Sequence, residues 1–382
     1  MPARGGAVTM ALHRPGRLSH ARTALRLRAA TRPRSVVLID VHGELTAGDL
    51  QGHLQLLERR GAERPRLGEL PPWAPLRQVL VTALAGHGHL DLRSSGTTGA
   101  PRVLERGPLT APQLRTLTDL ARRIGVRKGA RVATAIPGVH AHGLLLALAA
   151  LSAGSPLVDV SHLRVVDRVA LLHRTSPRML VGTPVHLADI LAADRELSGH
   201  VPLRIDRIVS TTDVLPDELR ADLARHWHAR VHDVYGSVET GTLTVDGRPL
   251  HGVEIRVRDG VLRTRTSFTR RRWLVTDHGE IDEQGAVHVT ARADAPDASP
   301  GMLRDPRGVV RLLQSQDGIR SVHLRFVPDE ELGRRTVAHV VLEEEEHEEG
   351  RVITPHGVRA LVRDRLGASS VPREVRISSR ER

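Results

Sequence analysis

Apolar and polar positions follow a repeating pattern along the middle of the chain. Between Gly99 and Tyr235, short runs rich in Val, Ile and Leu alternate with longer stretches whose apolar positions recur at helical spacing. Strands that alternate with helical stretches of about 10–15 residues are typical of parallel sheets covered by helices. The pattern therefore predicts a layered α/β domain with a largely parallel core.

The expected strands are runs of branched residues, and helices are expected between them. The strand predictions cover 35–41, 131–136, 156–160, 179–181, 207–210 and 231–235. The helix predictions cover 45–60, 113–124, 143–152, 165–174, 186–193 and 218–228, and Thr46 has the chemistry of an N-cap for the first of them. The segment 78–85 fits a short strand or a helix, and both stay open.

Beyond Arg248 the pattern changes to short β segments separated by turns. Strands are expected at 253–257, 261–266, 273–276 and 286–290, with Asp259-Gly260 as a hairpin turn. A stretch rich in Pro, Ala and Asp at 293–306 predicts a hinge. Beyond the hinge, helices at 308–315 and 357–366 and strands at 322–327 and 337–343 predict a small α+β unit.

The expected fold class is thus α/β, with a layered N-terminal domain, a β-rich subdomain and a small α+β C-terminal domain. The expected boundaries are a flexible basic arm at 1–34, a core domain at 35–292, the hinge at 293–306 and the C-terminal domain at 307–382. The first segment is assigned as an arm because it has many Arg residues and lacks the apolar region of a secretory signal.

The positive charge of the chain has two explanations. The formal net charge is +12, and Lys128 is the only lysine among the 56 basic residues. This preference for Arg indicates a coding bias. Aromatic residues make up only 2% of the chain and do not interleave with a basic patch, as they do in nucleic-acid-binding grooves. No nucleic acid partner is expected, and a protein that binds nucleic acid or an anionic surface through its Arg residues is kept as an alternative.

Residue usage also excludes several kinds of site. The chain has no Cys, which excludes disulfides, thiolate catalysis and Cys-based zinc sites. No apolar run approaches the roughly 20 residues that span a bilayer. We therefore expect no transmembrane segment and a cytoplasmic location. Although the chain has 22 His residues, no structural or catalytic metal site built from them is expected.

The most specific motif is a run of small and hydroxylated residues, Ser94-Ser-Gly-Thr-Thr-Gly-Ala-Pro-Arg102. Glycines let the backbone wrap closely around an anion, so that several N–H groups can point at one phosphate. The hydroxyl groups in the run add donors, and Arg102 adds a positive charge. The run does not satisfy the Walker A pattern. It predicts a phosphate-binding loop of another kind, with an ordinary surface turn as the alternative.

This run resembles the phosphate loop of the adenylate-forming enzymes, the acyl-CoA synthetase-like ligases. Their loop usually ends in Lys, where Arg102 stands here; Arg keeps the charge but differs in geometry. The resemblance assigns a catalytic role to Arg102 and a metal contact to Thr98. It assigns ATP binding to Ser94, Ser95, Gly96, Thr97, Thr98, Gly99 and Arg102.

Two further segments resemble motifs of the same family. The segment 135–144 matches one in which a conserved His, here His140, lies beside the acyl pocket and takes part in catalysis. The segment 234–241 resembles a Tyr-Gly-x-Thr-Glu motif. There, Tyr235 and Gly236 would contact the nucleotide, and Glu239 would hold Mg²⁺ and act in catalysis. Val238 stands where the family has Thr.

Three weaker matches complete the resemblance. Thr211 lies where the family places a loop of small residues against the adenine. Asp277 ends a segment that resembles Thr-Gly-Asp, and its carboxylate would accept both ribose hydroxyls. Arg292 would contact ribose or phosphate, two residues before Asp294, the expected pivot of the hinge. The shared order of these motifs supports the resemblance more than any one of them.

The resemblance implies that the protein is an enzyme that activates a fatty or aryl carboxylic acid with ATP and Mg²⁺. The acyl-adenylate would then react with coenzyme A or with the phosphopantetheine thiol of an acyl carrier protein. The chain resembles a shortened member of the family, and it ends at Arg382 without the Lys that usually stabilises charge during adenylation. A degenerate relative that binds nucleotide or an acyl group without full catalysis is the main alternative.

Overall fold

The structure is a computed structural model of the chain, and its largest element is a nine-stranded sheet. The structure describes residues 17–60, 66–71, 73–85, 90–93, 103–106, 109–197, 201–292, 303, 306–329, 333–342, 353–366 and 370–378. The order of strands in the large sheet is β11-β10-β9-β8-β7-β5-β6-β1-β2. Its strands are β1 (Val36–Asp40), β2 (Gly43–Thr46), β5 (Val132–Thr134), β6 (Leu157–Asp159), β7 (Met179–Gly182), β8 (Arg207–Thr211), β9 (Arg230–Ser237), β10 (Gly241–Val245) and β11 (Arg248–Pro249).

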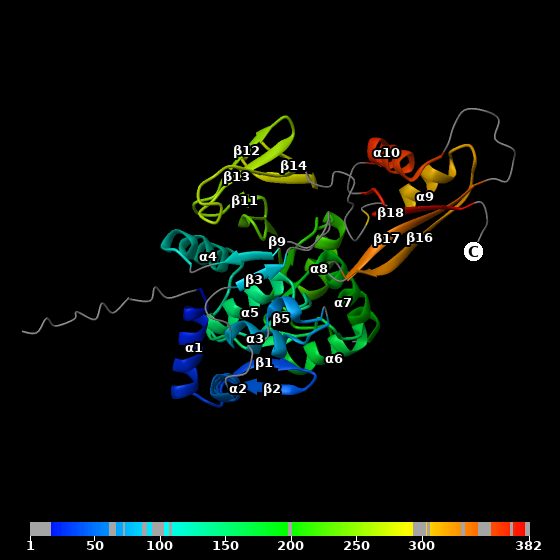
Figure 1. The fold of residues 1–382 in the computed structure, drawn as a ribbon. Coiled ribbons are helices and arrows are strands. Elements are labelled where there is room, and N and C mark those ends of the chain that lie inside the picture. The colour runs from blue at the N-terminus through cyan, green and yellow to red at the C-terminus, as the bar shows by residue number, and fades with distance from the viewer. Residues whose placement is uncertain are drawn as a thin grey trace, which may run out of the picture.

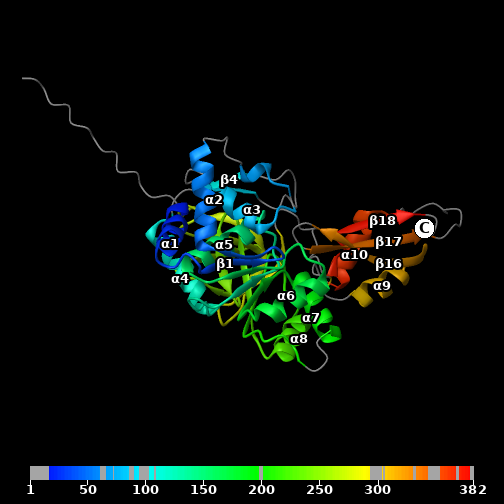
Figure 2. The ribbon, with the colours of Figure 1, turned by 90° about the horizontal axis from the view of Figure 1, so that it is seen from below.

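Six adjacent strands of this sheet, from β9 to β1, are parallel, and antiparallel strands close both edges. Helices cover both faces, each over its own hydrophobic core (Figures 1 and 2). One face carries α1 (Arg17–Thr31), α2 (Ala47–Arg60), α3 (Leu76–Ala85) and α5 (Ala141–Ala153). The other carries α6 (Val165–Thr175), α7 (Pro184–Leu197) and α8 (Asp217–Trp227). The predicted α/β class is confirmed.

The helix α2 begins where the sequence placed its N-cap. The Asp49 backbone N–H donates to Thr46 Oγ1 at 3.2 Å, and Thr46 N–H donates back to the Asp49 carboxylate at 3.1 Å. These two bonds satisfy donors that a helix start leaves open. The segment 78–85, for which strand and helix were both open, is helical, because it forms most of α3 and buries Val79, Leu80 and Leu84.

The expectation of a flexible arm over 1–34 is wrong for residues 17–31, which form α1. Ala21 and Leu25 of this helix are buried in the same core as α2 and α5. Burying an apolar side chain stabilises a fold by about 1.5–3 kcal/mol, which explains why this Arg-rich segment is ordered. Residues 1–16 lie outside the described ranges.

A smaller antiparallel sheet follows the large one in sequence. It contains β12 (Glu254–Arg258), β13 (Val261–Arg265), β14 (Leu274–Ile281) and β15 (Val287–Arg292). The predicted turn between β12 and β13 is confirmed, since Asp259 and Gly260 both have positive φ, 55° and 72°. Two more strands, β3 (Leu90–Arg93) and β4 (Val103–Arg106), form a separate hairpin, while α4 (Ala111–Arg123) lies against β10 and a short helix spans Leu67–Glu69.

The C-terminal part forms the expected small α+β unit (Figure 1). It contains α9 (Pro306–Gln314), β16 (Ile319–Asp329), β17 (Gly333–Leu342), α10 (Pro355–Leu366) and β18 (Glu374–Ser378) around a core of its own. The strand β17 contacts α7 of the large unit. Of the expected hinge, only Leu303 and Pro306 are described, and Leu303 is buried in the C-terminal core.

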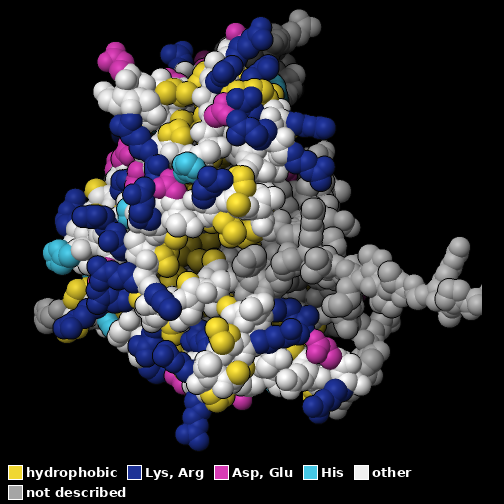
Figure 3. Space-filling view, turned by 90° about the vertical axis from the view of Figure 1, so that its left-hand side faces the viewer, with side chains coloured by type: hydrophobic (Ala, Val, Ile, Leu, Met, Phe, Trp, Pro, Cys, Tyr) yellow, Lys and Arg dark blue, Asp and Glu magenta, His cyan; other side chains and the backbone are white. Residues whose placement is uncertain are grey.

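Figure 3 shows one face of the molecule and how charge is distributed over it. Basic side chains are spread across this face and outnumber acidic ones, and a hollow near its centre is floored by hydrophobic side chains. A scattered distribution fits a general preference for Arg better than a dedicated basic groove. Within the described ranges, no helix combines the length and the apolar character needed to cross a membrane.

Candidate functional site

The carboxyl ends of the parallel strands lie at one edge of the large sheet, which is where open α/β sheets bind ligands. Thr211 is the last residue of β8, and Tyr235 and Gly236 lie near the end of the adjacent strand β9. His140 follows β5 and directly precedes α5, at the same edge. The fold therefore gathers four predicted site residues that are far apart in sequence.

A direct contact at this edge joins the large sheet to the four-stranded sheet. The Tyr235 hydroxyl donates a hydrogen bond to Asp277 Oδ2 at 2.5 Å, across 42 residues of sequence. Tyr235 belongs to β9 and Asp277 to β14. Two segments that separately resemble family motifs are thus in direct contact in the fold. Both side chains keep some exposed surface, so each can still contact a ligand.

The end of β8 contains polar atoms that the fold leaves without a partner. The hydroxyl oxygens of Ser210 and Thr212 are buried and make no hydrogen bond to any part of the chain that the structure describes. A buried hydroxyl in this state costs about 1–3 kcal/mol. Thr212 also has φ of 81°, a rare conformation for a β-branched residue. Orphaned hydroxyls and backbone strain beside Thr211 fit the binding of a ligand with polar edges.

Glu239 lies exposed in the turn between β9 and β10, and hydrogen bonds close this turn. Thr240 Oγ1 accepts the Ser237 N–H at 3.2 Å and donates to the Gly241 carbonyl at 2.8 Å. The Thr240 N–H in turn donates to Ser237 Oγ at 3.2 Å. A fixed backbone therefore presents the Glu239 carboxylate to solvent. Val238 packs against the hydrophobic core, so this position supplies packing and no hydroxyl.

Gly236 is required by the close approach of the two strands that flank this turn. A Cβ atom at this position would lie 2.5 Å from the carbonyl oxygen of Gly241 and 2.7 Å from Cα of Thr242. Both are backbone atoms of β10, which pairs with β9 at this point. Any larger residue would separate the strands, so Gly236 keeps the Glu239 turn in place.

His140 has polar neighbours that the sequence did not single out. Asp159 ends the strand β6, and burial raises the pKa of its carboxyl. The N–H and hydroxyl groups of Ser161 donate to Asp159 Oδ1 at 3.0 and 2.7 Å. His162 interacts electrostatically with both Asp159 and His140. These residues escaped notice because an Asp at the end of a buried strand has no distinctive local signature.

Several predicted site residues lie outside the described ranges. They are the loop residues Ser94, Ser95, Gly96, Thr97, Thr98, Gly99 and Arg102. The strands on both sides of this loop are described, and they pair as a hairpin with Arg93 opposite Val103. The backbone of Arg292 is also described, and it lies opposite Asp277 in the pair of β14 and β15.

The carboxylate of Glu239 has the chemistry of a Mg²⁺ ligand. Among the described residues, no group of three or more His, Asp or Glu side chains could hold a metal ion. Mg²⁺ is usually bound through one or two carboxylates together with the phosphates of a substrate and water. The exposed carboxylate of Glu239 fits this mode.

Asp233 on β9 gives the stability of this region a pH dependence. Burial raises the pKa of its carboxyl to about 7, with Asp246 and Asp213 adding to the rise and Arg220 opposing it. The pKa in the folded state exceeds the ordinary value of 3.8, so folding favours the protonated carboxyl. This stabilisation is present at low pH and is lost as the pH rises through about 7.

We therefore expect the urea midpoint of unfolding to be higher at pH 5 than at pH 8. The difference should shrink in Asp233→Asn, whose side chain does not titrate. Unfolding curves of both proteins at the two pH values test this expectation. If the urea midpoint of Asp233→Asn changes between pH 5 and pH 8 as much as that of the unaltered protein, other groups cause the pH dependence.

The central segment of the chain is similar to a known protein family. Residues 93–263 match the model of the AMP-binding enzymes. This segment, which is less than half of the chain, is similar to the AMP-binding enzymes. This match contains the end of β8 and the Glu239 turn. Asp277 lies beyond it, so the contact between Tyr235 and Asp277 supports the site independently of the match.

Two curated proteins that the chain is similar to are named as CoA ligases. The chain is 23% identical over 282 residues to an uncharacterised acyl-CoA ligase, YhfT, of Bacillus subtilis (strain 168), which covers 65% of this chain and 57% of that protein. It is 26% identical over 263 residues to a CoA ligase of Rhodococcus jostii (strain RHA1) named for a methyl-dioxo-octahydro-indenyl propanoyl group, covering 60% and 50%. The chain thus spans about half the length of these relatives.

Solved structures share the fold of the chain over most of its length. The amide bond synthetase McbA from Marinactinospora thermotolerans has a TM-score of 0.58 at 18% identity, with 95% of this chain and 96% of that chain covered. The o-succinylbenzoate CoA synthetase MenE from Bacillus subtilis, solved with the acyl-adenylate OSB-AMP, has a TM-score of 0.59 at 16% identity, with 94% and 95% covered. The chain therefore shares the fold of these two structures.

Proposed function

We propose that this protein uses ATP to activate a carboxylic acid as an acyl-adenylate and then transfers the acyl group to a thiol. The observation that carries the proposal is the hydrogen bond between Tyr235 and Asp277, at the carboxyl edge of the large sheet. It joins two motifs that resemble nucleotide-binding segments, and it lies beside the orphaned hydroxyls of β8. The kinship to acyl-CoA ligases adds support.

In the proposed reaction, the residues act mainly by positioning. Asp277 accepts hydrogen bonds from the ribose hydroxyls, while Thr211, Tyr235 and Gly236 line the adenine side. Glu239 would ligate Mg²⁺, with Thr98 as a further contact, and the ion would neutralise charge on the phosphates. The substrate carboxylate attacks the α-phosphorus and pyrophosphate leaves, so that no redox partner is required.

Other predicted residues complete the proposal. The loop from Ser94 to Arg102 would cradle the β- and γ-phosphates, and Arg292 would contact ribose or phosphate. His140 would border the acyl group, in a half-buried position near His162. We propose a fatty or aryl acid as substrate and coenzyme A, or a carrier-protein phosphopantetheine, as acceptor.

Exchange of labelled pyrophosphate into ATP tests the proposal directly. The protein is incubated with ATP, Mg²⁺ and one acid at a time, drawn from short-chain, medium-chain, long-chain and aromatic classes. Exchange that depends on one class is the expected result. It would establish adenylation and identify the substrate class.

The absence of exchange would overturn the proposed activity. If ATP still binds, the protein belongs to the alternative class that binds nucleotide without forming the adenylate. Packing of Val238 into the core, where related enzymes have a hydroxyl, is the feature that would then explain the loss. Equilibrium binding of ATP with and without Mg²⁺ separates these two results.

A further inference from the structure

The turn that carries Glu239 is held from outside by a loop of the four-stranded sheet. Thr266, directly after β13, donates a hydrogen bond from Oγ1 to the Thr240 carbonyl at 3.0 Å, and both residues are buried. Thr240 is the residue whose hydroxyl closes the Glu239 turn. A single hydrogen bond thus links Thr266 to the backbone of the turn that carries Glu239.

The hydroxyl of Thr266 is fully used. Besides donating to Thr240, Oγ1 accepts the backbone N–H of Phe268 at 3.0 Å and of Thr269 at 3.2 Å. A hydroxyl has one donor and two acceptor positions, and all three are filled here. The group therefore has a single orientation, which makes it a rigid link between the loop and the turn.

A second contact between the same loop and turn depends on Gly241. Gly241 has φ of 72°, and a Cβ atom there would lie 2.7 Å from the ring of Phe268. The ring therefore packs directly on the backbone that follows Thr240. The loop holds the turn through one hydrogen bond and one packed surface.

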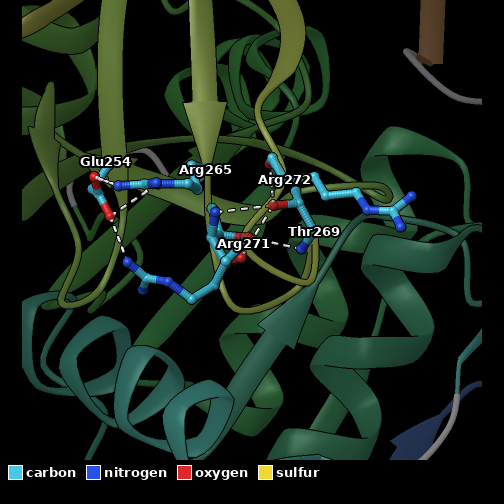
Figure 4. Close-up of polar contacts among 6 residues, drawn as sticks. Glu254, Arg265, Thr269, Arg271 and Arg272 are labelled. Carbon is cyan, nitrogen blue, oxygen red and sulfur yellow. Dashed lines mark hydrogen bonds and ion pairs between the residues drawn. The ribbon is translucent and has the colours of Figure 1, made fainter.

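The loop itself is clamped at its base, as Figure 4 shows. Glu254 of β12 accepts hydrogen bonds from Arg265 and from Arg271, which stand at the two ends of the loop. Thr269 Oγ1 donates to the Arg272 carbonyl at 2.7 Å and accepts the Thr266 N–H at 3.1 Å.

Two strained backbone conformations and a hydrogen bond from α4 indicate that the conformation of this loop is fixed by its surroundings. Arg270 and Arg271 have φ of 51° and 60°, in the left-handed region that residues other than glycine rarely adopt. Such strain persists where surrounding contacts fix the backbone. Gln113 of α4 also donates to the Ser267 carbonyl at 3.2 Å. The loop is therefore a rigid support that reaches from the small sheet to the turn.

We infer that Thr266 is a positioning residue for Glu239: its hydroxyl fixes the turn and thereby the carboxylate that would bind Mg²⁺ with the nucleotide. This inference rests on the proposed function. The residue lies beyond the segment that matches the AMP-binding enzymes, and its role comes only from the contacts described here. Residues that orient a metal ligand affect metal affinity by about 10–100-fold when they are replaced.

The test compares three variants of the full chain. Thr266→Val removes the hydroxyl at nearly constant shape, and Thr266→Ser keeps it. Thr269→Val is the matched control, because its buried hydroxyl bonds only within the loop. Calorimetric titration with ATP at several Mg²⁺ concentrations measures the metal dependence of binding, and thermal unfolding measures stability.

We expect Thr266→Val to weaken Mg²⁺-dependent ATP binding by about tenfold. Thr266→Ser should bind like the unaltered protein, and Thr269→Val should lose stability without a change in Mg²⁺ dependence. If Thr266→Val does not fold, Thr266→Ala removes the same hydroxyl in a smaller side chain and takes its place in the comparison. A loss of Mg²⁺ dependence in Thr266→Ser, or in Thr269→Val, would overturn the inference.

The outcomes separate this inference from the proposed function. Unaltered protein that binds no ATP overturns both. Unaltered protein that binds ATP with Mg²⁺ and supports exchange upholds the function, and normal binding by Thr266→Val then overturns the positioning role alone. Binding without exchange overturns the acyl-adenylate activity, and the Thr266 comparison still decides the positioning role.

Discussion

Replacement of Glu239 by Gln is expected to abolish the Mg²⁺-dependent part of ATP binding. Gln keeps the size of the side chain but removes the charge that attracts a hard cation. The turn should keep its shape, because its hydrogen bonds come from Ser237, Thr240 and Thr266. Pyrophosphate exchange should fall by about 10²–10³, the usual effect of losing one electrostatic contact to the reacting phosphates.

The matched control for this variant is Glu280→Gln. Glu280 is an exposed carboxylate on β14, within the four-stranded sheet. The Glu280→Gln substitution removes the same charge from the chain and should leave both ATP binding and pyrophosphate exchange unchanged. Titrations with and without Mg²⁺ compare the two variants. If Glu239→Gln responds to Mg²⁺ as the unaltered protein does, the assignment of the metal ligand is wrong.

Replacement of Asp194 by Ala is expected to cause a large loss of stability. Asp194 lies on α7 and is fully buried. Its carboxylate is 3.0 Å from His173 Nε2 and 2.9 Å from His226 Nε2, and it accepts hydrogen bonds from Trp227 Nε1 at 2.8 Å and Leu203 N–H at 3.2 Å. It therefore ties α6, α7 and α8 together beneath the sheet.

Ala at position 194 would leave the buried N–H groups of Trp227 and Leu203 without an acceptor. Each such group costs about 1–3 kcal/mol, so a loss of about 3 kcal/mol or more is expected in urea unfolding. Asp222→Ala is the control, since Asp222 pairs with Arg195 and Arg225 on the surface of α8. Exposed pairs contribute about 0–1 kcal/mol. Similar losses in both variants would contradict the role of the buried carboxylate.

Most helices and strands of the core could be predicted, because burial on a sheet or helix face imposes a period on the sequence. The helix α5 and the strand β7 follow this rule. The strand β10 was not predicted, although Thr242 to Val245 alternates and Asp246-Gly247 marks a turn. The helix α1 was missed for another reason: its many Arg residues hide the two positions that it buries.

The site could be predicted only where a residue carries a local motif. Tyr235 and Asp277 were found in this way, yet only the fold reveals that their side chains are bonded. Thr266 and Asp159 have no such motif, since their importance comes from partners that are distant in sequence. A threonine after a strand and an aspartate at the end of one are common, and the long-range contacts alone distinguish them.

The helix α1 changes what counts as the smallest unit of this chain able to fold. Leu25 and Ala21 fill space between α2 and α5, so a polypeptide beginning at Ser35 would expose the apolar surface that they cover. That surface would favour association between copies or capture by chaperones. The unit that folds on its own therefore includes α1, and a proteolytic cut between Thr31 and Val36 is expected to destabilise it.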